Sequence, residues 1–91
     1  MGFIYDKAKS EANLEKHGID FEEAQLLWDD PDLMEFRIEF KGELRVGVMA
    51  RYAGSCWVAI TAPRGSNVRI ISVRRATIKE VSLYDKAKND R

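Results

Sequence analysis

Ionisable residues at three places in the chain have the chemistry to move protons near a phosphate. His17 is the only histidine, and histidine ordinarily titrates near neutral pH, so it is a candidate proton carrier. It is equally suited to a structural role, because a cation in the last turn of a helix interacts favourably with the helix dipole. Glu43 and Arg45 lie two residues apart and project from one side of a strand. They are either a base beside a charge stabiliser or an ordinary ion pair.

Arginines further along the chain are candidates for binding phosphate, since the planar guanidinium makes forked contacts that lysine cannot make. Arg64 lies in a loop with a proline and a glycine, where an exposed side chain suits ligand contact. Strict alternation places Ser72 and Arg74 on one face of the last strand and Arg69 on the other. Each of these arginines alone is weak evidence for a site.

Cleavage of RNA without a metal ion needs a proton acceptor for the 2′-hydroxyl, cations for the phosphorane and a donor for the 5′-oxygen. His17 or Glu43 can exchange protons, and Arg45, Arg64 and Arg74 can stabilise charge. Further basic residues are predicted to hold the RNA: Lys9, Lys16, Arg69 and Arg75. A solvated helix face explains the two lysines equally well. The same residues also fit a non-catalytic module that binds RNA or protein.

Charge is segregated along the 91-residue chain although the net charge is zero. The stretch from Asp20 to Glu43 contains nine acidic and two basic residues, a net charge of −7. The stretch from Leu44 to Glu80 contains seven basic residues and one acidic residue, a net charge of +6. The basic part is interpreted as an RNA-handling surface. Alternatively, the acidic part is the working surface and serves a basic partner.

The elements that must position these residues follow from caps and periodicity. A short edge strand is predicted at 3–5. A helix over about 7–16 is capped by Asp6, and Gly18 closes it. A second helix begins after Asp20 and ends at Asp30-Pro31, which makes the first thirty residues a helical hairpin. A last helix is predicted over 76–88.

Between these helices, apolar and polar residues alternate with the period of strands. Four antiparallel strands are predicted, at 34–41, 43–50, 57–62 and 68–73, with a loop over 63–67. Helices segregated to one face of an antiparallel sheet give an α+β fold. A chain of this length forms one domain, residues 1–91.

Composition excludes several other classes of protein. One Cys and one His cannot supply a structural zinc site, and no carboxylate cluster has calcium-loop spacing, so neither a metal nor a cofactor is expected. No apolar run approaches the roughly 18 residues of a membrane span, and no secretory signal is evident at the start. A single cysteine fits a reducing compartment, and a cytoplasmic location is expected.

Two runs of residues together resemble the BrnT family of ribonuclease toxins from bacterial type II toxin-antitoxin pairs. They are Lys-His-Gly-x-x-Phe-Glu-Glu-Ala at 16–24 and Arg-Ile-Ile-Ser-x-Arg-x-Ala at 69–76. Further matching positions span nearly the whole chain: Tyr5-Asp6, Lys9, Asn13, Asp30-Pro31, Glu43, Arg45, Glu80 and Tyr84.

The resemblance implies a RelE-like fold, RNA cleavage and neutralisation by a BrnA-like antitoxin of the ribbon-helix-helix type. It implies contact with DNA only indirectly, through that antitoxin. It favours His17, Glu43, Arg45, Arg64 and Arg74 as the site. In a toxin of this family the acidic stretch is a possible docking face for the antitoxin.

Overall fold

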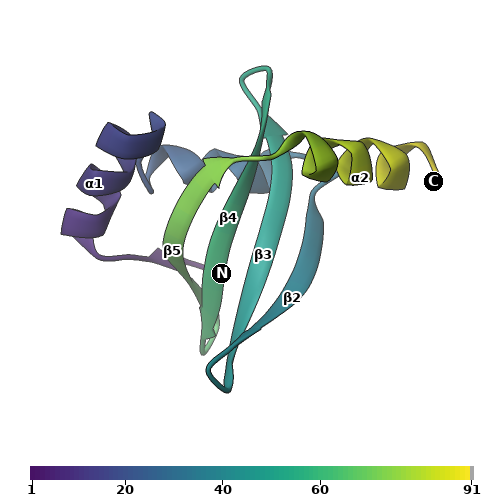
Figure 1. The fold of residues 1–91 in the computed structure, drawn as a ribbon. Helices are drawn as coiled ribbons and strands as arrows, with labels where there is room; N and C mark the ends of the chain where they lie inside the picture. Colours follow the sequence, from purple (N-terminus) through teal and green to yellow (C-terminus); the bar gives the residue numbers. More distant parts are fainter. Residues whose placement is uncertain (91) are drawn as a thin grey trace.

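A capped helix lies near each end of the chain, as predicted (Figure 1). The structure, a computed structural model, describes residues 1–90. Helix α1 (Lys7–His17) begins after Asp6, whose side chain accepts a hydrogen bond from the backbone of Lys9, and ends at Gly18 with φ 83°. Helix α2 (Ile78–Asn89) begins with a capping box between Thr77 and Glu80. No helix among the described residues is long and apolar enough to cross a membrane.

The second predicted helix forms, but as a 3₁₀ helix, η1 (Glu23–Asp29). The expected cap is present, because the backbone nitrogen of Glu23 donates to Asp20 Oδ1 at 2.8 Å. Ala24 and Leu27, three residues apart, are fully buried. That spacing matches the three-residue turn of a 3₁₀ helix, so packing against the sheet favours the tighter form.

The sheet has five strands in the order β1-β5-β4-β3-β2. They are β1 (Phe3–Ile4), β2 (Met34–Phe40), β3 (Glu43–Tyr52), β4 (Ser55–Arg64) and β5 (Asn67–Arg75). The α+β class and the four antiparallel strands are confirmed. The short first strand joins them as a parallel edge on β5. Strands β4 and β5 also extend into the predicted loop, so Arg64 is the last residue of β4.

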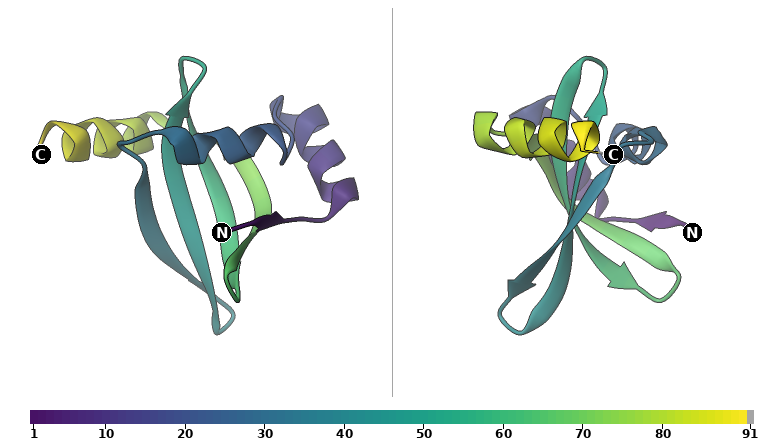
Figure 2. Two further views of the ribbon diagram at one scale, coloured as in Figure 1. Left: turned by 180° about the vertical axis from the view of Figure 1, so that it is seen from behind. Right: turned by 90° about the vertical axis from the view of Figure 1, so that its right-hand side faces the viewer.

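The sequence predicted that the helices segregate to one face of the sheet. This prediction is wrong. Leu27 of η1 packs with Val48 and Ala59, whereas Tyr84 of α2 packs with Met49 and Val58. Neighbouring residues in a strand point to opposite faces, so η1 and α2 cover opposite faces, here called the η1 face and the α2 face (Figure 2). The central strands are apolar on both sides and therefore need cover on both.

Helix α1 packs at the edge of β5 beyond the reach of the short β1. Asn13 is buried there and donates from Nδ2 to the carbonyl of Val73 at 2.9 Å, while its Oδ1 accepts from the Val73 nitrogen at 3.1 Å. Its amide takes the place of a neighbouring strand and satisfies the exposed edge. Asn13 therefore anchors the helix that carries Lys9 and His17.

Candidate active site

A β-bulge interrupts β5. Ile60 of β4 pairs with Ser72, yet the next residue, Thr61, pairs with Ile70, which leaves Ile71 as the extra residue. Alternation of side chains between the two faces therefore changes phase within the strand.

This change of phase decides where two of the predicted arginines lie. Arg69 pairs with Ala62, and Arg74 pairs with Val58. Because Val58 and Ala62 are four residues apart in β4, their partners share a face. The expectation that Arg69 and Arg74 point to opposite faces is wrong, since strict alternation does not hold across a bulge. Both lie on the α2 face.

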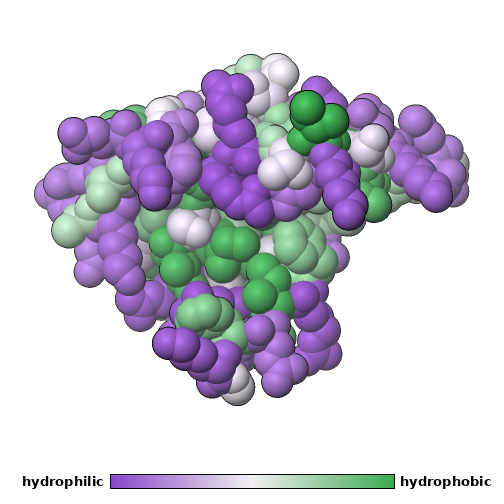
Figure 3. Space-filling view, in the orientation of Figure 1, coloured by the Kyte–Doolittle hydropathy of each residue, from purple (hydrophilic) through white to green (hydrophobic). Residues whose placement is uncertain are grey.

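A polar pocket of about 210 Å³ lies on this face, where β3 begins and β4 ends. Four elements contribute its lining, which consists of Lys9, Glu43, Arg45, Arg64, Arg69 and Ile71. Four cationic side chains thus surround one carboxylate. Figure 3 shows this side of the molecule, with apolar residues gathered below α2 and hydrophilic residues bordering them.

The carboxylate is held loosely in the pocket. Arg64 Nη2 lies 3.4 Å from Glu43 Oε1, and the two side chains are 42% and 50% exposed. A second nitrogen of Arg64, Nη1, donates to the carbonyl of Pro63 at 2.9 Å. A single long contact between exposed groups adds little to stability. Glu43 therefore remains accessible to a ligand.

Arg45 is positioned by an aromatic ring. Its guanidinium carbon lies 4.3 Å from the centroid of the Phe40 ring. It makes no hydrogen bond or ion pair with any other described side chain, and its Nε is buried without a partner. Its two terminal nitrogens are consequently free for a ligand in the pocket. Phe40 was not among the predicted site residues, although its pairing with Glu43 places it on the same face as Glu43 and Arg45.

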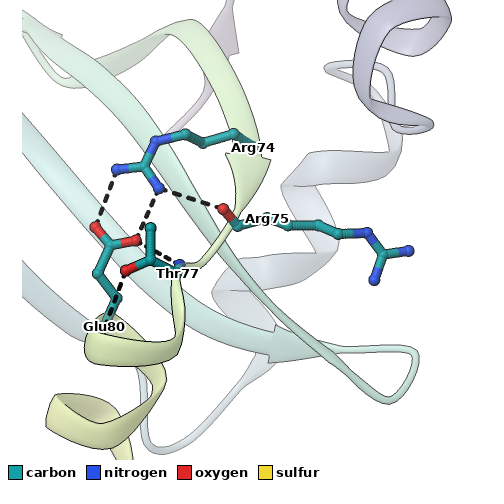
Figure 4. Close-up of polar contacts among 4 residues, drawn as sticks. All are labelled: Arg74, Arg75, Thr77 and Glu80. Atoms are coloured by element: carbon teal, nitrogen blue, oxygen red, sulfur yellow. Dashed lines mark hydrogen bonds and ion pairs between the residues drawn. The ribbon is translucent and has the colours of Figure 1, made fainter.

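Arg74 lies further along the same face and is already bound. Its Nη1 and Nη2 donate to Glu80 Oε1 and Oε2 at 2.8 and 2.9 Å (Figure 4). These hydrogen bonds from Arg74 lower the pKa of Glu80 to about 2. Those to Glu80 raise the pKa of Arg74 in turn. The pair joins the end of β5 to the start of α2.

The remaining predicted residues are not brought to the pocket. Arg75 points away from Arg74 (Figure 4), lies 5.0 Å from the Trp57 ring centroid and donates to Ser55 Oγ at 2.9 Å. Lys16 and His17 occupy the last turn of α1. With a rise of about 1.5 Å per residue, His17 lies roughly 12 Å along the axis from Lys9. Among the described residues, no group of three or more His, Cys, Asp or Glu could hold a metal ion.

Comparison with known proteins identifies the family. Residues 5–80 match the model of the ribonuclease toxin, BrnT, of type II toxin-antitoxin systems. No curated protein matched the chain. The matched segment contains every residue that lines the pocket, together with the Arg74–Glu80 pair. A ribonuclease toxin of such a system acts on RNA and has a cognate antitoxin. Because the match covers well over half of its length, the chain belongs to the BrnT family of ribonuclease toxins of type II toxin-antitoxin systems.

Proposed function

We propose that the pocket formed by Lys9, Glu43, Arg45, Arg64 and Arg69 is where this toxin cleaves RNA, and that it does so without a metal ion. The observation that supports this proposal is the convergence of four cations from four elements on one accessible carboxylate. Charge that is fixed where negative charge develops lowers the barrier to phosphoryl transfer. The pocket therefore suits the phosphorane better than the ground-state phosphodiester.

In the proposed reaction, the Glu43 carboxylate takes the proton from the ribose 2′-hydroxyl, and the 2′-oxygen attacks phosphorus. Arg45 and Arg64 neutralise the charge that builds on the phosphoryl oxygens. The bond to the 5′-oxygen breaks, and that oxygen takes a proton from Lys9. The products are a 2′,3′-cyclic phosphate and a 5′-hydroxyl. Of the two predicted proton carriers we favour Glu43, because His17 lies at the far end of α1.

Metal independence rests on the charge of the pocket. Four cations and one carboxylate give a positive site, which repels a divalent ion and supplies the stabilisation that the ion would supply. Purified toxin should cleave a labelled single-stranded RNA equally well with and without EDTA. Its products should carry 2′,3′-cyclic phosphate ends. Loss of cleavage in EDTA, restored by Mg²⁺, would contradict this part of the proposal.

Replacing arginines on the two faces separates catalysis at the pocket from general binding of RNA. Arg64→Ala should lower kcat by about 10²-fold. Arg37→Ala is the matched control, since Arg37 is exposed and pairs with Val46 on the η1 face. Equal effects of both changes would remove the case for this pocket. A module that only binds RNA would bind it without cleaving it, even as the wild-type chain.

We also propose that the cognate antitoxin is BrnA-like and basic, and that it docks on the acidic side of the toxin in the cytoplasm. Glu35 and Glu39 pair with Val48 and Leu44 and so lie on the η1 face, away from the cationic pocket. Such charge separation lets one protein hold RNA and a basic partner on different surfaces. Replacing both glutamates with glutamine should weaken copurification with the product of a neighbouring ribbon-helix-helix gene and leave RNA cleavage intact.

A further inference from the structure

Phe40 is an unusually exposed aromatic residue beside the pocket. Phe40 is 44% exposed at the end of β2, and it pairs with Glu43. Phe36, on the same face of the same strand, is packed against the core beneath α2. Its ring fills the space over Gly47. The fold therefore accounts for Phe36 and leaves Phe40 without a packing role of similar weight.

Phe40 and Arg45 form a stack with unused binding capacity. The guanidinium lies 4.3 Å from the ring centroid, and the ammonium of Lys41, on a flexible chain, lies 5.4 Å from it. No described group accepts a hydrogen bond from the Arg45 side chain. Since Arg45 also lines the pocket, the stack joins a flat hydrophobic surface to the proposed phosphate site.

We propose that Phe40 and Arg45 form a subsite for an unpaired nucleobase next to the scissile phosphate, which makes single-stranded RNA the substrate. This inference rests on the proposed function. Single-stranded bases stack on aromatic rings and on guanidinium planes, whereas a base in a duplex is already stacked and cannot reach them. Four cations on the adjoining surface favour a polyanion over an apolar protein segment as the occupant.

The subsite can be tested without catalysis by using a tetradeoxynucleotide, which lacks the attacking 2′-hydroxyl and is not cleaved. Phe40→Ala should weaken its binding about 5- to 150-fold, the equivalent of about 1–3 kcal/mol per stacked base. Binding of an abasic oligonucleotide of the same length should not change. Phe40→Trp should retain tight binding, and Phe40→Leu, which keeps the apolar volume without the ring, should not.

Leu44→Ala is the matched control, because Leu44 is 40% exposed on the same hairpin but faces the other side. It should bind both oligonucleotides like the wild type. Equal loss for base-bearing and abasic oligonucleotides, or no loss in Phe40→Ala, would overturn the subsite. So would loss of antitoxin copurification with oligonucleotide binding intact, which would make Phe40 a contact for the antitoxin.

Cleavage assays then test the substrate class. Wild-type toxin should cleave a single-stranded RNA and leave the same sequence intact in a duplex. Equal cleavage of both would overturn the inference and leave the proposed function standing. If the wild type cleaves neither RNA, the proposed function fails, while the deoxynucleotide measurements still decide whether Phe40 binds a base.

Discussion

Two arginine–glutamate pairs on the α2 face have the same chemistry and opposite character. Arg64 meets Glu43 through one contact of 3.4 Å, and both side chains are about half exposed. Arg74 meets Glu80 through two contacts of 2.8 and 2.9 Å, and Glu80, only 21% exposed, also accepts from the nitrogen of Thr77 at 2.8 Å. Geometry, and not residue type, leaves the Arg64–Glu43 pair available to a ligand, and it is here called the open pair. The Arg74–Glu80 pair, here called the closed pair, instead links β5 to α2.

The difference follows from what each pair connects. Arg74 and Glu80 are joined across the junction of β5 and α2, where the capping box fixes the carboxylate. Tyr84, one turn further on, is buried and donates to Asp30 Oδ2 at 2.6 Å. Glu43 and Arg64 lie at strand ends, where the one further contact is the hydrogen bond from Arg64 Nη1 to the carbonyl of Pro63. The Arg74–Glu80 pair therefore stabilises one end of the sheet, and the Arg64–Glu43 pair at the other end stays accessible to a ligand.

The largest effect should come from removing the proposed base at the open pair. Glu43→Gln should lower kcat for RNA cleavage by about 10²- to 10⁴-fold, because an amide cannot accept the 2′-hydroxyl proton. Glu39→Gln, on the opposite face of the same hairpin, should cleave at the wild-type rate. Steady-state cleavage of a labelled RNA measures both. Full activity in Glu43→Gln would mean that another group, His17 first, moves the proton.

A smaller effect, on stability, should come from breaking the closed pair. Glu80→Ala removes two charge-assisted hydrogen bonds and half of a capping box, so the free energy of unfolding should fall by about 1–2 kcal/mol. Arg64→Ala should change it by less than about 0.5 kcal/mol. Urea unfolding monitored by circular dichroism makes the comparison. Equal losses would show that the two pairs do not differ as their geometry indicates.

The closed pair should also make stability depend on pH. The pKa of Glu80 is about 2 in the folded state, against the ordinary glutamate value of 4.5. A depressed pKa stabilises the fold above the unfolded value, and the contribution is lost as the pH falls from about 4.5 towards 2. The difference in unfolding free energy between wild type and Glu80→Gln should therefore shrink over that range. A difference that stays constant down to pH 2 would contradict the assignment.

The smallest effect concerns phosphate binding by Lys9, measured apart from its proposed part in catalysis. A plot of log binding constant against log salt concentration has a negative slope. Lys9→Ala should make this slope less steep by about 0.7, which corresponds to the loss of one phosphate contact to a single strand. Lys86→Ala, an exposed change on α2, should leave the slope unaltered. Fluorescence titrations of the deoxynucleotide at several salt concentrations give both slopes. A reduced slope in Lys16→Ala as well would extend the RNA path along α1.

Local signals predicted the helices and strands well, and long-range packing decided the rest. Asp6 and Thr77 cap their helices as expected, since a cap depends only on its near neighbours. That α2 and η1 cover opposite faces depends on both alternating sets of β3 and β4 being buried, which the apolar run at 57–62 signalled only in part. The 3₁₀ form of η1 depends on its contact with the sheet, which no cap residue reveals.

For the site, spacing within one strand was enough to predict that Glu43 and Arg45 project from the same side, and both line the pocket. Arg69 was misplaced because a bulge leaves no mark in an alternating pattern. Arg74 was predicted for the site, but its partner Glu80 lies in a different element, and only the fold brings them into contact. The sequence shows Phe40 as an aromatic residue next to a turn. Only the structure shows that its ring contacts Arg45 of the neighbouring strand, and that contact is the basis of the proposed nucleobase subsite.

The bulge in β5 also determines which genetic changes the toxin can tolerate. A missense change at Ile71 leaves the number of residues between Arg69 and Arg74 intact, so both side chains keep their face. An in-frame loss of that single codon would make the strand regular and leave Arg69 and Arg74 four residues apart, so both would still lie on the α2 face. We expect neither change at this position to be frequent among cells that escape the toxin, because both leave the arginines where they are.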